Sequence, residues 1–203
     1  FFKYNPNLTD RSTAGLQGVV RDTISDYNFN NLNKFDGVFR HSQILKLIDN
    51  SDRGIINSTV RPYMFKTISA KANKRDNDFR LSYASPIFDS GNSLDYVIDS
   101  SPFKINGVDH FFGDKAIDES TDRRVIAYKI VEGKNVTTIN DCGIIQPAEG
   151  IVILNNFGID SDTEIRVIVT PNSLDIAPKR DQLLDIKQAH VTIKPEVDTI
   201  TVA

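Results

Sequence analysis

The three histidines are the first residues to consider for metal binding or acid–base chemistry. His41, His110 and His190 lie far apart in the sequence. None of them has the spacing of an HExxH or a CxxC…HxxxH arrangement, so the spacing predicts no metal site. His110 lies on an expected hairpin strand among aromatic residues, where packing or simple exposure is the better interpretation. We expect no metal ion and no cofactor.

The stretch Asp160-Ser161-Asp162-Thr163-Glu164 alternates acidic residues in the manner of a calcium loop. An EF-hand loop also requires Gly at its sixth position and Glu at its twelfth, which here are Ile165 and Pro171. Because Asp favours turns, the sequence predicts a solvated turn before a strand.

The sequence offers little support for nucleophilic or acid-catalysed chemistry. Cys142 is flanked by Asp141 and Gly143 rather than by basic groups that would lower the pKa of its thiol. The sequence has no phosphate loop and no Gly-x-Ser-x-Gly elbow. Its 27 acidic residues offer too many carboxylate pairs for any one to indicate a glycosidase. We therefore predict a protein that is not an enzyme and has no catalytic residue, with a cryptic hydrolase as the third hypothesis.

Composition restricts the partners. The net charge is −3 and the basic residues are scattered, which argues against nucleic acid. No apolar run approaches the roughly 20 residues that span a bilayer, so no membrane partner is expected. The single cysteine excludes an internal disulfide and favours a reducing compartment. Because the chain begins with Phe1 in place of Met, we expect a fragment or a processed product.

The elements that would carry any site are turn-rich and mostly extended. The sequence has 22 Asp and 17 Asn but only 5 Glu, which favours turns and strands over helices. Two helices are nevertheless indicated near the start. In the first, Leu16, Val19, Val20, Ile24 and Tyr27 form one apolar stripe, with Thr9 or Ser12 as N-cap and Asn28 as its end. In the second, Ser42 is the expected N-cap of Gln43 to Asp49, with Ile44, Leu45 and Ile48 facing inward.

Alternation replaces helical periodicity near Asn57, which we take as the domain boundary. Asn106-Gly107 predicts a type I′ hairpin, and Gly54 is expected in a left-handed conformation after the second helix. The predicted fold class is α+β, mostly antiparallel β, with two short N-terminal helices packed on or beside a β-rich region. The expected strands are Val60 to Ala70, Phe79 to Tyr83, Phe103 to Ile105, Val108 to Phe112, Val125 to Val131, Val136 to Ile139, Ile144-Ile145, Ile151 to Leu154, Ile165 to Val169, Val191 to Ile193 and Val197 to Val202.

One long stretch resembles a known family. It comprises Gly18-Val-Val-Arg-Asp-Thr-Ile-Ser-Asp-Tyr27, an Asn-rich linker, Gly37-Val-Phe-Arg-His-Ser-Gln-Ile-Leu-Lys-Leu-Ile-Asp49 and Asp52-Arg-Gly-Ile-Ile-Asn-Ser-Thr-Val60. This resembles the C-terminal motif of the baseplate J family of contractile phage tails. The continuation, above all residues 165–186, is similar to the T4-type members, the large baseplate wedge subunits.

The resemblance implies a domain 1–57 with the helical baseplate J-like motif and a β-rich domain 58–203. It also implies the C-terminal part of a larger structural subunit of a phage tail baseplate. Such a subunit would form homodimers, bind neighbouring wedge proteins and build a ring around the central hub. It would be assembled in the host cytoplasm and located in the virion. The alternative is a β-sandwich binding module, such as an adhesin or a lectin-like tail domain, although the chain has no Trp for an aromatic platform.

Overall fold

The structure is a computed structural model that describes residues 1–72, 77–92, 95–179 and 182–198. The chain forms two compact units. Unit 1 consists of Phe1–Arg61 with Leu174–Ala203, and unit 2 is Pro62–Ser173. The chain thus leaves unit 1 four residues after the expected boundary at Asn57 and returns to it at Leu174, so the last segment packs with the N-terminal helices.

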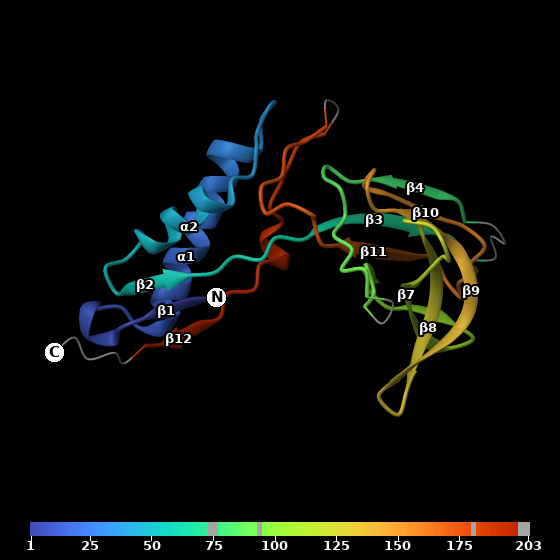
Figure 1. Ribbon diagram of the computed structural model, residues 1–203. Coiled ribbons are helices and arrows are strands. Elements are labelled where there is room, and N and C mark those ends of the chain that lie inside the picture. The colour runs from blue at the N-terminus through green and yellow to red at the C-terminus, as the bar shows by residue number, and fades with distance from the viewer. Residues whose placement is uncertain (73–76, 93–94, 180–181, 199–203) are drawn as a thin grey trace. The chain divides into compact units, whose positions relative to one another are not determined.

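Unit 1 packs two helices with a small sheet (Figure 1). In the sheet, β1 is the central strand, parallel to β12 and antiparallel to β2. The bounds are β1 Phe2–Tyr4, α1 Thr13–Tyr27, α2 His41–Asp49, β2 Ile55–Ser58 and β12 Pro195–Val197.

The first helix follows its predicted pattern. Ser12 is the N-cap, and its Oγ accepts a hydrogen bond from the Gly15 amide at 3.2 Å. Leu16, Val20 and Tyr27 are buried, which confirms the apolar stripe. The helix ends at Asn28 as expected.

The second helix begins differently from its prediction. Ser42 lies inside α2, whose N-cap is Arg40 and has no side-chain capping bond. Instead, Asp175 Oδ1 accepts a hydrogen bond from the His41 amide at 2.9 Å. The expected left-handed Gly54 is also wrong, because its φ is not positive. A Cβ on Gly54 would lie 2.7 Å from Thr9 Cβ, so close approach explains the glycine there.

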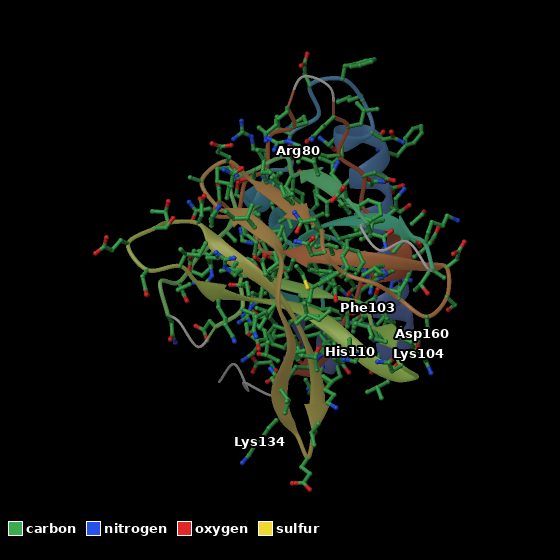
Figure 2. All side chains as sticks on the ribbon, turned by 90° about the vertical axis from the view of Figure 1, so that its right-hand side faces the viewer. Arg80, Phe103, Lys104, His110, Lys134 and Asp160 are labelled. Atoms are coloured by element: carbon green, nitrogen blue, oxygen red, sulfur yellow. The ribbon has the colours of Figure 1, made fainter. Side chains whose placement is uncertain are left out.

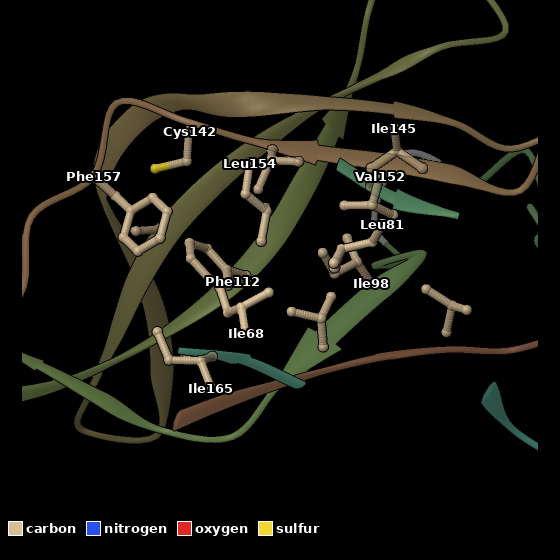
Figure 3. Close-up of a cluster of buried hydrophobic side chains, with 14 of the residues drawn as sticks. Ile68, Leu81, Ile98, Phe112, Cys142, Ile145, Val152, Leu154, Phe157 and Ile165 are labelled. Atoms are coloured by element: carbon tan, nitrogen blue, oxygen red, sulfur yellow. The ribbon is translucent and has the colours of Figure 1, made fainter. Parts of the chain in front are cut away.

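Unit 2 is a sandwich of two sheets with a continuous apolar core between them (Figure 3). Ile68 and Ile165 of one sheet face Phe112, Cys142 and other residues of the other sheet. The six-stranded sheet has the order β4-β10-β9-β8-β7-β6 and the three-stranded sheet has the order β3-β11-β5. The bounds are β3 Met64–Ala70, β4 Phe79–Ser82, β5 Ile98–Ser100, β6 Phe103–Ile105, β7 Val108–Ala116, β8 Arg123–Val131, β9 Lys134–Gln146, β10 Ile151–Leu154 and β11 Thr163–Val169.

The α+β class with mainly antiparallel strands is confirmed. The predicted hairpin is also confirmed, with positive φ at Asn106 and Gly107 between β6 and β7. One observed strand, β9, contains two strands that were predicted separately, Val136 to Ile139 and Ile144-Ile145. Its pairing with β8 shifts register between them, and the strand continues through the shift. Residues 191–193 are not a strand, and of the predicted strand at 197–202 only Val197 belongs to one, while 199–202 lie outside the described residues.

Candidate assembly surface

His41 and His110 lie in separate environments, and His190 ends a short 3₁₀ helix, Gln188–His190. His41 Nε2 is 2.9 Å from the Val60 carbonyl, and His110 Nδ1 is 2.9 Å from the Val108 carbonyl. His110 is buried beside the ring of Phe103 (Figure 2), which agrees with packing. Among the described residues, no cluster of three histidine, cysteine or acidic side chains could hold a metal ion.

The acidic stretch at 160–164 stabilises turns. Asp160 accepts hydrogen bonds from the amides of Asn106 and Gly107, at 2.8 and 2.6 Å, and so holds the β6–β7 turn (Figure 2). The Gly107 amide, and to a smaller extent the Asn106 amide, lowers the pKa of the Asp160 carboxylate. Asp162 binds Lys71 Nζ and the Ala72 amide instead. The carboxylates therefore diverge, and the predicted turn before a strand is observed.

Cys142 is a core residue. Its side chain is completely buried in the sandwich (Figure 3), and burial, with a smaller effect of Asp141, raises the pKa of its thiol to about 12. The thiol is therefore protonated at neutral pH and closed to solvent, which does not suit a nucleophile.

Unit 2 also contains a buried ion pair that the sequence did not reveal. Asp114 and Arg123 are 0% and 3% exposed and bond each other directly. Asp114 also accepts hydrogen bonds from the Val97 and Ile98 amides, at 2.7 and 3.1 Å. Burial raises the pKa of Asp114, and Arg123 with the two amides opposes this shift. Every polar group here has a partner within the fold, so the pair positions β5 against β7 and offers nothing to a ligand.

A depression of about 240 Å³ lies on the surface of unit 2. Arg124 and Asp141 line it and form an ion pair with each other. Their charges therefore largely neutralise each other.

The most exposed apolar side chains lie in one tight loop of unit 1, residues 28–37, which we call the display loop. It starts with a π-helical turn, Asn28–Leu32, closed by the Asn33 amide donating to the Asn28 carbonyl at 3.0 Å. Turns of this type are rare and often occur at functional sites. Leu32 is 1% exposed and anchors the loop to the core of unit 1.

The rest of the display loop has little conformational freedom. Asp36 has a φ of 61°, a left-handed conformation that is uncommon for residues other than glycine and that Asp adopts more readily than most. A Cβ on Gly37 would lie 2.4 Å from the Leu32 carbonyl oxygen, so only glycine fits. Lys34 Nζ also donates to the Asn30 carbonyl at 2.8 Å. These contacts favour the observed conformation of the loop.

This loop presents two phenylalanines to solvent. Phe29 and Phe35 are 77% and 84% exposed, the highest values among the large apolar side chains described. Aromatic side chains on a preformed backbone are favourable contact residues, because little conformational entropy is lost on binding. The display loop is our candidate assembly surface.

A second exposed apolar surface lies on the hairpin of β8 and β9, whose outer end carries Lys134 (Figure 2). Ile130, Val131 and Val136 are 56%, 43% and 42% exposed there. Neither surface was predicted from the sequence. The two phenylalanines within an Asn-rich linker could have indicated the display loop, because a solvated linker usually contains few large apolar residues.

Fold and surface together define a two-unit α+β protein whose candidate sites are exposed contact surfaces. Residues 2–67, about a third of the chain, match the family model of the baseplate structural protein gp6, C-terminal domain III. The matched range contains α1, α2 and the display loop, and the match supports a structural role in a phage baseplate. It is a match to a gp6 domain rather than to the baseplate J family. No curated protein matches the chain. No described helix has both the length and the apolar character needed to cross a membrane.

Proposed function

We propose that this chain is a structural subunit of a contractile phage tail baseplate that forms homodimers and binds neighbouring wedge proteins. These contacts would build the ring around the central hub. The observation that carries the proposal is the gp6 domain match over residues 2–67, inside which the display loop exposes Phe29 and Phe35. In this proposal the protein has no enzymatic activity, no cofactor and no nucleic acid or membrane partner. It is assembled in the host cytoplasm and resides in the virion.

The proposal is tested by sedimentation of the chain over a range of concentrations, alone and with the other wedge proteins. We expect a concentration-dependent homodimer, and complexes with at least one wedge protein. Phe29→Ser with Phe35→Ser should weaken one of these associations about tenfold or more, because exposed aromatic residues supply much of the energy of an interface.

The matched control is Ile130→Ser with Val136→Ser, which removes two exposed apolar side chains from the β8–β9 hairpin of unit 2. We expect this variant to associate as the unmodified chain does. A strict monomer at high concentration that binds no wedge protein would contradict the proposal. Equal weakening by both variants would show that general surface hydrophobicity, rather than the display loop, drives association.

A second candidate function follows from the sandwich of unit 2. Two antiparallel sheets around one core are an architecture shared by many carbohydrate- and protein-binding modules, so an adhesin or lectin-like tail domain is the alternative. It predicts saturable binding of the chain to members of a glycan array, which a purely structural subunit does not show.

A further inference from the structure

The segment 182–198, which we call the strap, returns to unit 1 after unit 2 and lies along α1 and β1. We infer that the strap is exchanged between two copies of this chain, so that the strap of one copy lies on unit 1 of the other. The inference rests on the proposed self-association and specifies how that association is made.

The strap contributes half-buried but no fully buried side chains to unit 1. No residue between 182 and 198 is fully buried. The buried apolar residues of unit 1 come from residues 2–55, with Ile176 as the one addition from the returning segment among those described. Detachment of the strap therefore removes no fully buried apolar side chain from unit 1.

The strap is attached mainly through backbone groups. Strand β12 pairs in parallel with β1, where the Phe2 amide donates to the Lys194 carbonyl at 3.0 Å. On α1, Gln17 Nε2 donates to the Ile193 carbonyl at 3.2 Å. Asn28 holds the other end, accepting from the Ile186 amide and donating to Asp185, each at 2.8 Å. An identical strap from another copy makes all these bonds equally well.

One side chain of the strap is enclosed without making a hydrogen bond. The side-chain nitrogen and oxygen of Gln188 are both enclosed and have no hydrogen-bond partner among the described residues. An enclosed amide without partners opposes burial, so the strap is held less firmly than its backbone bonds suggest.

The connection before the strap also favours exchange. Asp175 and Ile176 are fixed to unit 1 by bonds to His41 and Phe39. Pro178 follows, and a proline disfavours the helical conformation of the residue before it, here Ala177, and keeps the chain extended. A chain that is extended at this point can cross to a neighbour, and exchange of an identical element is a low-cost route to a dimer. At the high local concentration of a ring, the strap of a neighbour competes effectively.

Paired cysteines on the strap and on β1 test the exchange. Lys3 and Glu196 are opposite each other in the β1–β12 pair, and both side chains are partly exposed. Two chains with different affinity tags are co-expressed, one with Lys3→Cys and the other with Glu196→Cys, and treated with a short bis-maleimide. Because Cys142 is buried, the unmodified chain serves as the blank.

Exchange predicts a cross-linked species that contains both tags. The control pair combines Lys3→Cys with Lys134→Cys, since Lys134 is an exposed residue at the end of a hairpin outside unit 1. In exchanged dimers the two thiols are held at an effective concentration in the millimolar range, so we expect about tenfold or more product over the control.

A third variant, Lys3→Cys with Glu196→Cys in one chain, separates the two possible failures. If it cross-links only within the chain while sedimentation shows dimers, exchange is overturned and the proposed self-association stands. If the chain is monomeric at every concentration and no mixed species forms, both are overturned. A mixed species well above the control supports the exchange.

Discussion

At the scale of single residues, the buried Asp114–Arg123 pair ties together several segments of unit 2. Arg123 also donates to the Asp95 carbonyl at 3.0 Å and reaches Asp89 at 3.3 Å. One guanidinium thus links β8 to the segment before β5. Its neighbour Arg124 forms an ion pair with Asp141 whose side chains are about half exposed. Adjacent arginines therefore contribute very differently to stability.

Arg123→Met should lower the free energy of unfolding of unit 2 by about 3–5 kcal/mol, because it leaves the Asp114 carboxylate enclosed without its cation. Arg124→Met is the matched control and should cost less than about 1 kcal/mol, since exposed ion pairs contribute little. Urea unfolding of both variants measures the difference. Equal costs would mean that the Asp114 carboxylate is not charged in the folded protein.

The stability of unit 1 is expected to depend on pH through the Asp175 carboxylate. The His41 amide, and then Arg40, hold the pKa of this carboxylate below its ordinary value. A lowered folded-state pKa adds stability that is complete above the unfolded pKa of about 3.9 and is lost as the pH falls through the folded value. Asp175→Asn should therefore be less stable at pH 7 and show a smaller loss of stability between about pH 5 and pH 3. Thermal unfolding at a series of pH values provides the comparison; parallel curves would contradict it.

Residues whose role depends on near neighbours were predictable from the sequence. Ser12 caps the amides that follow it, and Asn106-Gly107 needs only its own φ values, so both were found. Arg123 and Asp175 act on residues 9 and 134 positions away. No local pattern marks such partners, and the candidate site was missed for the same reason, because the exposure of Phe29 and Phe35 depends on how the display loop closes.

At the scale of elements, the two helices of unit 1 begin by different means. The N-cap of α1 is supplied locally by Ser12, whereas the first amide of α2 is bonded to Asp175 from the returning segment. Ser42 looks like an N-cap in the sequence because it precedes an amphipathic run. In the structure the helix begins one residue earlier, at His41, because the His41 amide already has a hydrogen-bond acceptor in Asp175. Ser42 therefore lies inside the helix.

Ser12→Ala should therefore destabilise unit 1 by about 1 kcal/mol, the ordinary cost of losing an N-cap hydrogen bond. Ser42→Ala should change stability by less than about 0.5 kcal/mol, because Ser42 is an exposed residue of the first helical turn. Chemical denaturation followed by circular dichroism at 222 nm reports both. A larger loss of stability for Ser42→Ala than for Ser12→Ala would indicate that Ser42 is the N-cap of α2.

Strand positions were predicted better than strand pairing. The apolar run of β10 and the alternation of β11 are visible in the sequence, and both strands were expected close to their observed bounds. The three-residue strands β1 and β5 were missed, since so short a segment shows no measurable period. Their formation depends on neighbours that are remote in sequence, such as Ser58 opposite Phe2.

At the scale of the whole molecule, unit 2 is an insertion in unit 1. The chain enters it through β3 and leaves through β11, and these strands pair antiparallel from Met64 opposite Val169 to Ala70 opposite Thr163. Entry and exit are thus adjacent, which is the geometry that lets a domain be inserted into another without disturbing it. The core of the sandwich consists only of residues between 64 and 169.

Because each unit has its own core, we expect two separable unfolding transitions in the full chain. Phe112 is fully buried in the sandwich, so Phe112→Ala should lower the stability of unit 2 by about 3–5 kcal/mol and shift only one transition. Val20 is buried in α1. Val20→Asp should therefore abolish the unfolding transition of unit 1 or strongly lower its midpoint temperature, because an unpaired carboxylate is costly to bury. Differential scanning calorimetry, with hydrogen exchange to assign the transitions, distinguishes the cases. A single transition that both variants shift together would mean that the two units fold as one, and the strap would then be too tightly coupled to the fold to exchange between copies.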